Sequence, residues 1–208
     1  MAVASLSNFT VPLANNQSAN TQGLLMPKLK YRFRATFTNF GVSLTTTELT
    51  KQVMDIKRPN VTFTPVPIDV YNSKIYLQGK PEWQETTVNL RDDATGAVSK
   101  LVGEQMQKQF DFLEQASAPS GINYKFLLTF DILDGGNGTT GPTVLESWDL
   151  DGCFLSAIDY GEMNYNSNDP AQIALSIRFD NATQTAGISK TTTVNQAGYT
   201  PGNAITGQ

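Results

Sequence analysis

The chain has 208 residues, with 19 acidic and 15 basic side chains, one cysteine and no histidine. This length is enough for one domain with its own hydrophobic core. The absence of histidine excludes Ser-His-Asp and Cys-His nucleophilic sites and histidine-ligated metals. The single Cys153 excludes an internal disulfide and a multi-cysteine metal site. We therefore expect a protein that is not an enzyme and that uses no cofactor.

The remaining composition favours strands and turns. Only 16% of the residues are charged, while the chain holds 24 Thr and 16 Asn, a mixture typical of half-polar strands and turns. A net charge of −4 gives no general attraction to nucleic acid. Residues 1–23 lack the basic start and unbroken apolar stretch of an export signal, and no window resembles a membrane span. We expect no membrane insertion.

Period-2 alternation predicts several strands. Over residues 30–37, Tyr31, Phe33, Ala35 and Phe37 alternate with basic or polar residues, which indicates a strand buried on one face. A weaker strand is expected over 49–56, and further ones over 61–63, 83–90, 123–133, 144–151, 154–160 and 172–179. Residues 69–78 are expected to form a strand or one arm of a hairpin that closes at Gly79. Pro65 and Pro67 exclude a central hydrogen-bonded strand after residue 63. The glycine-rich stretch 135–142 predicts a hairpin loop, and it lacks the Gly-Lys-Ser/Thr sequence of a phosphate-binding loop.

One segment changes to helical spacing. Asp92 or Asp93 can cap a helix over about 95–114, before Pro119 and Gly121. Its apolar stripe is Val98, Leu101, Val102, Met106, Phe110 and Leu113. Its polar face carries Lys100, Glu104, Gln107, Lys108 and Asp111. The predicted fold is mainly β: an antiparallel β-sandwich or barrel with this one flanking α-helix.

Charge is distributed unevenly along the chain. Eight acids and no base lie between Lys125 and Arg178: Asp131, Asp134, Glu146, Asp149, Asp151, Asp159, Glu162 and Asp169. An earlier run holds four bases and no acid: Lys28, Lys30, Arg32 and Arg34. Three explanations stay open, namely an ordinary solvated surface, complementarity between neighbouring copies, and an acidic surface that repels an anion.

A series of short motifs, in order, resembles the tail tube proteins of T4-like contractile-tail phages. The motifs include Tyr31-Arg32-Phe33-Arg34, Val70-Tyr71-Asn72-Ser73-Lys74, Trp83 with the Asp-headed helix, Leu145-Glu146-Ser147-Trp148 and Arg178-Phe179-Asp180-Asn181. The resemblance covers residues 24–181 as a tail tube β domain. It leaves a polar N-terminal arm, 1–23, and a polar C-terminal tail, 182–208, which either are disordered or order against neighbouring copies.

The resemblance implies a structural subunit of the virion tail, assembled in the host cytoplasm. Hexameric rings would stack into a tube that conducts DNA without binding it specifically, with the tail sheath, baseplate, tail-terminator and tape-measure proteins as partners. Together with the charge pattern, it suggests Asp149, Asp151 and Asp159 as acids of the lumen or of subunit borders. Lys28, Lys30, Arg32 and Arg34 become a candidate inter-subunit strand, and Lys100, Glu104, Gln107, Lys108 and Asp111 a candidate sheath-facing helix surface.

Ring stacking needs an extended element, and we expect residues 8–23 or 45–67 to supply it. Two other functions stay open. One is the tube of a phage-like bacterial injection system, of tailocin or secretion-system type. The other is a carbohydrate-binding β-sandwich, for which Trp83 and Trp148 are the tryptophan candidates.

Overall fold

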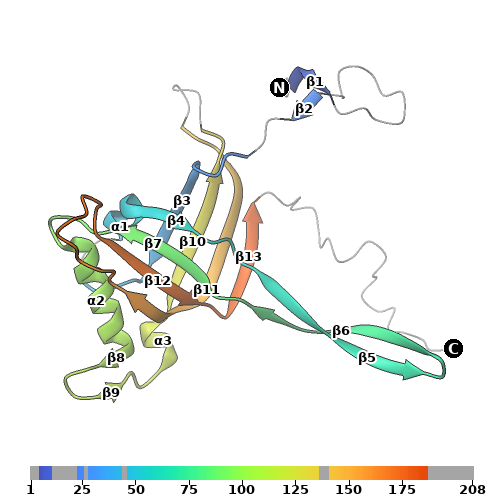
Figure 1. Ribbon diagram of the computed structural model, residues 1–208. Coiled ribbons are helices and arrows are strands. Elements are labelled where there is room, and N and C mark those ends of the chain that lie inside the picture. The colour runs from blue at the N-terminus through green and yellow to red at the C-terminus, as the bar shows by residue number, and fades with distance from the viewer. Residues whose placement is uncertain (1–4, 11–22, 26–27, 44–45, 136–140, 187–208) are drawn as a thin grey trace.

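A computed structural model describes residues 5–10, 23–25, 28–43, 46–135 and 141–186 (Figure 1). Its strands are β1 (Ser5–Thr10), β2 (Gly23–Leu25), β3 (Phe33–Thr38), β4 (Val53–Ile56), β5 (Val61–Val70), β6 (Ser73–Trp83), β7 (Thr86–Arg91), β8 (Phe110–Asp111), β9 (Ala116–Ser117), β10 (Phe126–Leu133), β11 (Val144–Asp159), β12 (Gln172–Arg178) and β13 (Asn181–Ala186). Its helices are α1 (Thr47–Gln52), α2 (Ala97–Gln109) and α3 (Gly121–Tyr124). The mainly β, antiparallel architecture is confirmed.

Seven strands form one bent antiparallel sheet in the order β3-β10-β11-β12-β7-β4, with β13 also paired to β11. The long strand β11 is shared by the two halves of the sheet. Its residues 147–151 pair with β13, and its residues 154–159 pair with β12. The two strands predicted here are therefore one. The chain bends at Gly152, which has φ +67°, and a Cβ there would lie 2.2 Å from Asp180 Oδ2.

The core lies inside the bend. Phe126, Leu128, Phe130 and Ile132 of β10 are buried, as their alternation predicts, and Leu128 is paired with Phe37 on one side and Leu150 on the other. The first turns of α2 add Val98, Leu101 and Val102, each fully buried. Each such side chain contributes roughly 1.5–3 kcal/mol by leaving water.

The predicted helix is real but shorter than 95–114. It begins after Gly96, so Asp93 is not the capping residue, although its Oδ1 accepts the Val98 N–H at 3.2 Å. It ends at Gln109, since Phe110 is extended and Asp111 Oδ1 accepts the amides of the next turn. Such local side-chain bonds compete with helix continuation. Leu113, expected in the apolar stripe, is consequently 93% exposed.

The strand expected over 49–56 is wrong in its first half, where the chain forms α1 before β4. Leu49 is fully buried and Val53, four residues later, also packs on the core. This i,i+4 spacing suits a helical turn against β3 and β7, and tertiary burial here overrides the strand propensity of the threonines.

Strands β5 and β6 form a long two-stranded hairpin that projects from the sheet (Figure 1). We call it the β5–β6 hairpin (residues 61–83). It turns at Tyr71 and Asn72, not at Gly79 as expected, and β6 runs straight through Gly79. Pro65 and Pro67 lie in β5, which is not a central strand, because among the described residues it pairs with β6 alone. Its other edge has no neighbouring strand, so the N–H groups that proline lacks are not needed there.

The sheet continues into the first residues of the expected C-terminal tail, while the division into domains stays a prediction. Residues 181–186 form β13, and Ala182 of this strand is buried opposite Leu150. The remainder of the expected C-terminal tail, 187–208, lies outside the described residues, as does most of the N-terminal arm except β1 and its partner β2. Within the described part of the chain, none of the helices has the length and apolarity required to cross a membrane.

Candidate assembly surfaces

One half of the sheet presents a polar face opposite the core. The side chains that alternate with the buried ones on β3, β10, β11 and β13 lie in register across all four strands, as in the row Thr36–Thr129–Asp149–Thr183. We call this surface the polar sheet face, and its members are Arg34, Thr36, Thr129, Asp131, Ser147, Asp149, Asp151, Asn181 and Thr183. Because side chains alternate along a strand, these residues share one surface.

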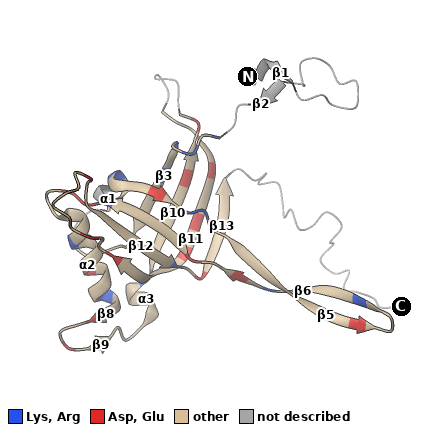
Figure 2. Cartoon of the chain, viewed as in Figure 1, with Lys and Arg blue, Asp and Glu red and all other residues tan. Residues whose placement is uncertain are grey.

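The structure brings two of the three candidate lumen acids together. Asp149 and Asp151 both lie on the polar sheet face, and Asp149 accepts a hydrogen bond of 2.9 Å from Thr129 Oγ1. Asp159 lies at the far end of β11, on the other half of the sheet, where its Oδ1 accepts the Gly161 N–H. Figure 2 shows acidic positions at intervals along β10 and β11.

The candidate inter-subunit bases are largely engaged within their own subunit. Lys28 Nζ lies 2.5 Å from Glu146 Oε2, and Arg34 Nη2 lies 2.7 Å from Asp131 Oδ2. Arg32 Nη1 donates to the Asp134 carbonyl at 2.6 Å, while Lys30 is exposed. Asp131 and Glu146 thus find partners in the basic run of the same chain. Complementarity between neighbouring copies was one of three explanations that the sequence left open, and the inter-subunit role of this run stays a prediction.

Glu146 is the centre of one of these clusters. Its carboxylate also accepts Trp148 Nε1–H at 2.7 Å and has Arg58 Nη2 at 3.9 Å. Burial by itself raises the pKa of Glu146, but the hydrogen bonds from Lys28 and Trp148, together with the nearby positive charges, hold that pKa below its usual range. The carboxylate therefore stays ionised in a mostly buried position.

The expected sheath-facing residues of the helix divide into two groups. Lys100 and Gln107 are exposed on α2, and Asp111 is exposed beyond the helix end. Glu104 instead accepts the N–H groups of Val42 and Ser43 at 2.8 and 2.9 Å, together with the Ser43 hydroxyl. The pKa of Glu104 is lowered to about 2, and the hydrogen bond from the Ser43 hydroxyl is the largest cause.

Lys108 binds the other side of the same turn. Its Nζ donates to the carbonyls of Asn39 and Gly41 at 3.0 and 3.2 Å, and partial burial lowers its pKa. Both turn residues have positive φ, 64° and 66°. Sequence reasoning missed this docking of the 39–43 turn onto α2. The available signal was the Asn-Phe-Gly triplet, since Asn and Gly favour left-handed backbone.

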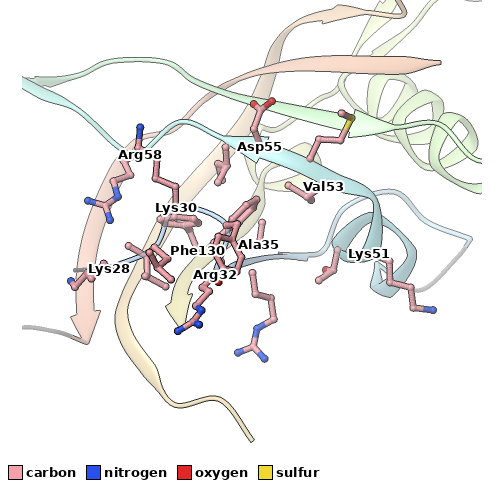
Figure 3. A pocket seen from close by; sticks show the side chains of 17 residues that line it. Lys28, Lys30, Arg32, Ala35, Lys51, Val53, Asp55, Arg58 and Phe130 are labelled. Carbon is pink, nitrogen blue, oxygen red and sulfur yellow. The ribbon is translucent and has the colours of Figure 1, made fainter. Parts of the chain in front are cut away.

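A cleft lies between β3 and β4, which are the first and last strands in the order β3-β10-β11-β12-β7-β4 (Figure 3). Its volume is about 1080 Å³. Apolar side chains line its floor: Phe33, Ala35, Val53, Ile56, Phe130 and Ile132. Bases line its rim: Lys28, Lys30, Arg32, Arg34, Lys51 and Arg58. Asp55 is the one acid among the described residues that line this basic cleft.

The tryptophans and the cysteine support no separate site. Trp83 and Trp148 are half-buried against the core, and Trp83 packs on Phe179, so neither offers an open platform for a sugar ring. Cys153 is fully buried, donates to the Leu150 carbonyl, and has its pKa raised to about 12 by burial. In the described ranges no group of three or more Cys, Asp or Glu side chains is placed to hold a metal ion.

No known protein-family profile matches the chain, and no curated protein matches its sequence. Solved structures do match its fold. A chain of the anti-feeding prophage tube-terminating cap gives a TM-score of 0.59 at 13% identity, over 83% of this chain and 99% of that one. A chain of the sheath/tube terminator of an extracellular contractile injection system gives 0.56 at 13% identity, over 79% and 100%.

A chain of a sheath–tube complex of an extracellular contractile injection system, in its extended state, gives a TM-score of 0.54 at 12% identity, over 77% and 92%. The chain therefore shares the fold of chains found in the sheath–tube and cap structures of contractile injection systems. The narrower likeness to the T4-like phage family stays a prediction.

Proposed function

We propose that this chain is a structural subunit of a contractile phage tail, and that its hexameric rings stack into the inner tail tube. The observation that carries the proposal is the polar sheet face together with its two borders. Within the described chain, β3 pairs with β10 alone and β13 with β11 alone, so both borders of this four-stranded surface have free strand edges. Pairing of β13 of one copy with β3 of the next would continue the sheet around a ring.

In this proposal the polar sheet face lines the lumen. Threonine and asparagine make it hydrophilic, and Asp149 and Asp151 add negative charge. A negative wall repels phosphates, so DNA passes without specific binding. Asp131, which is paired with Arg34, adds little net charge to this surface.

The β5–β6 hairpin supplies the contact between rings. An isolated two-stranded hairpin is marginally stable in water, and this one exposes many apolar side chains. They are Phe63, Val66, Ile68, Val70, Tyr71, Ile75, Tyr76 and Leu77. Covering them against the adjacent ring would stabilise both the hairpin and the stack. This refines the expectation that residues 45–67 reach the next ring; the contribution of residues 8–23 stays a prediction.

The partners follow from the position of the tube. The tail sheath would meet the exposed side of α2, and baseplate and tail-terminator proteins would cap the two ends of the tube. A tape-measure protein would fill the lumen before DNA ejection. Chains of similar fold occur in sheath–tube, baseplate and terminator structures, which supports this arrangement. The protein would be located in the virion tail after assembly in the host cytoplasm, and would act without enzymatic activity.

A tube of a phage-like bacterial injection system is the second candidate, favoured by the structural similarity to chains of such systems. The genes beside this one distinguish the two functions, since terminase and capsid genes accompany a phage tail. The carbohydrate-binding alternative is not favoured, because Trp83 and Trp148 both pack against the core.

Negative-stain electron microscopy of the purified full chain tests the proposal. We expect rings at moderate concentration and stacked tubes at high concentration. Sedimentation velocity over the same concentrations measures the assembled fraction. A chain that sediments as a monomer at every concentration would contradict the proposed function.

A further inference from the structure

A small knob projects from the end of α2. Phe112 and Leu113, at its tip, are 59% and 93% exposed, and Asp111 and Glu114 flank them directly. Neither carboxylate has a salt bridge to a described residue of its own chain. We call residues 111–114 the acidic knob. Two adjacent exposed apolar side chains between two carboxylates are unfavourable in water and suit a partner surface that is apolar at its centre and basic around it.

The knob is held in one shape. Asp111 Oδ1 accepts the N–H groups of Leu113 and Glu114 at 2.9 and 3.2 Å, and β8 pairs with β9 at its base. The rings of Phe110 and Phe112 pack edge to face with centroids 5.0 Å apart. A preformed element loses less conformational entropy when it binds, so the knob is well suited to docking.

The basic cleft has the complementary character. Its floor is apolar, including Phe130 and Val53, and Lys30 and Arg32 stand at its rim (Figure 3). Even without Lys51, the five other bases of the cleft outnumber Glu146, Asp131 and Asp55, so the cleft keeps a positive excess. It lies between β3 and β4, so a segment of another copy can reach it from solvent. The outer edge of β4 has free backbone groups among the described residues even when β3 pairs with β13 of a neighbouring copy.

We propose that the acidic knob of one copy docks in the basic cleft of the next copy. Figure 1 shows β8 and β9 beyond the C-terminal end of α2, apart from α1 and β4, so the knob and the cleft are separate surfaces that one chain can offer to two different neighbours. Such a head-to-tail contact repeats, and it closes into a ring when the rotation per subunit permits. The inference rests on the proposed function, because it specifies which surfaces hold neighbouring subunits together.

A second acidic segment with exposed apolar side chains could also occupy the basic cleft. The loop between β11 and β12 exposes Met163 and Tyr165 beside Glu162 and Asp169. Its apolar side chains are not adjacent in sequence. Strands β11 and β12 pair at its base, but the loop between them, residues 160–171, is much longer than the turn that joins β8 to β9 in the knob. The uncharged N-terminal arm offers the cleft no charge complement. We therefore place the knob in the cleft and use the loop as a control.

Paired charge-reversal variants of the full chain test the contact. The knob variant carries Leu113→Lys and Glu114→Lys and keeps Asp111, so the bonds that shape the turn remain. The cleft variant carries Lys30→Glu and Arg32→Glu and leaves the pairs of Lys28 and Arg34 intact. The control variant carries Glu162→Lys and Met163→Lys, which reproduces the knob changes on the comparison loop. Thermal unfolding at low concentration checks that each variant folds.

We expect each of the two test variants alone to need at least about ten-fold more protein for assembly, because like charges then meet across the contact. A mixture of the two should recover assembly. The lysine knob meets the glutamate cleft at one contact, while the unchanged knob meets the unchanged cleft at the next, giving alternating rings. The control variant should assemble like the wild type. A milder Leu113→Ser change should weaken assembly without changing the unfolding midpoint, since Leu113 is exposed in the free subunit.

Other outcomes separate the two proposals. If the wild type assembles and the knob variant assembles equally well, the docking inference is wrong while the tube function stands. Loss of assembly in the control but not in the knob variant would make the comparison loop the occupant. A cleft variant that assembles normally but loses affinity for a short DNA duplex, measured by fluorescence anisotropy, would make the cleft a nucleic-acid site. A wild type that never assembles contradicts both proposals.

Discussion

Arg34 and Asp131 face each other across the β3–β10 pair, with Arg34 Nη2 2.7 Å from Asp131 Oδ2. Arg34 Nε also donates to this oxygen at 3.2 Å, and Ser147 Oγ donates to the other carboxylate oxygen at 2.7 Å. Three neighbouring strands are thus tied together at one nearly buried carboxylate on the polar sheet face. The pair neutralises charge on a surface that we propose to line the lumen.

Asp131→Ala should destabilise the isolated subunit by about 1–3 kcal/mol, because Arg34 and Ser147 both lose their acceptor. Urea unfolding monitored by circular dichroism measures the change, and a double-mutant cycle with Arg34→Ala isolates the pair. The exposed Lys74–Asp69 pair, at 3.3 Å near the hairpin tip, serves as the control, where the same cycle should give less than about 1 kcal/mol. Equal coupling energies in the two cycles would mean that burial of Asp131 does not strengthen its interaction with Arg34.

Glu104 should make stability depend on pH in the acid range. Its pKa is lowered to about 2 in the folded chain by bonds from the 42–43 turn, against an ordinary value of 4.5. Its contribution is therefore complete above the ordinary pKa and is lost as pH falls from 4.5 toward 2. Glu104→Gln should remove this part of the pH dependence. Thermal unfolding between pH 2 and 6 measures the effect, and Glu162→Gln, on an exposed loop, should leave the profile unchanged.

Gly79→Ala should distort the β5–β6 hairpin without disturbing the core. A Cβ at this position would lie 2.1 Å from the Thr64 carbonyl oxygen, so the two strands must separate locally. We expect rings to form but tubes to shorten, as seen by electron microscopy. Gly103→Ala is the matched control, since its Cβ meets nothing within 4 Å and alanine favours the helix by about 1 kcal/mol. Normal tube length in the Gly79 variant would contradict the role of the hairpin in stacking.

Replacement of Asp149 and Asp151 by lysine should leave tubes intact and slow DNA ejection, because phosphates would then bind the wall. Asp159→Lys alone serves as the comparison. We expect it to slow DNA ejection less, because Asp159 lies on the other half of the sheet, where β11 pairs with β12. Ejection is measured in virions whose substitutions are confirmed. If ring stability instead falls as ionic strength rises, the acids lie at attractive subunit borders; lumen acids repel one another, and salt relieves that repulsion.

Lys100→Glu with Gln107→Glu should spare tubes and impair sheath attachment, since both side chains are exposed on α2. Glu104 and Lys108 are unsuitable for this test, because their substitution would release the 39–43 turn. Cosedimentation of assembled tubes with purified sheath protein measures attachment. If the double variant instead fails to form rings, this side of α2 lies between subunits.

The regular alternation of β10 and β12 made most of the core predictable. Phe126, Leu128, Leu175 and Ile177 are buried as their period-2 pattern indicates, because strand geometry alone decides which face a side chain takes. By the same rule Asp149 and Asp151 share one face of β11, while Leu150 between them lies in the core.

Local side-chain bonds and long-range contacts account for what the sequence did not reveal. Asp111 ends α2 earlier than its apolar spacing suggests, and Leu49 is drawn into a helix by burial. The pairing of Arg34 with Asp131 joins residues 97 positions apart, so charge counting alone could not distinguish it from pairing between copies. The knob and the cleft likewise exist only once the fold brings β3 beside β4 and leaves Leu113 exposed.

Gly152 has a further consequence for the size of the assembly. Its left-handed backbone bends β11, and the carboxylate of Asp180, whose amide bonds to the Asp151 carbonyl, occupies the space that a side chain would need. The bend sets the angle between the two halves of the sheet, and hence the taper of the subunit. In a closed ring of identical wedges, the taper fixes how many fit around the circle. The bore of such a tube would therefore be determined by a residue inside each subunit as well as by the contacts between subunits.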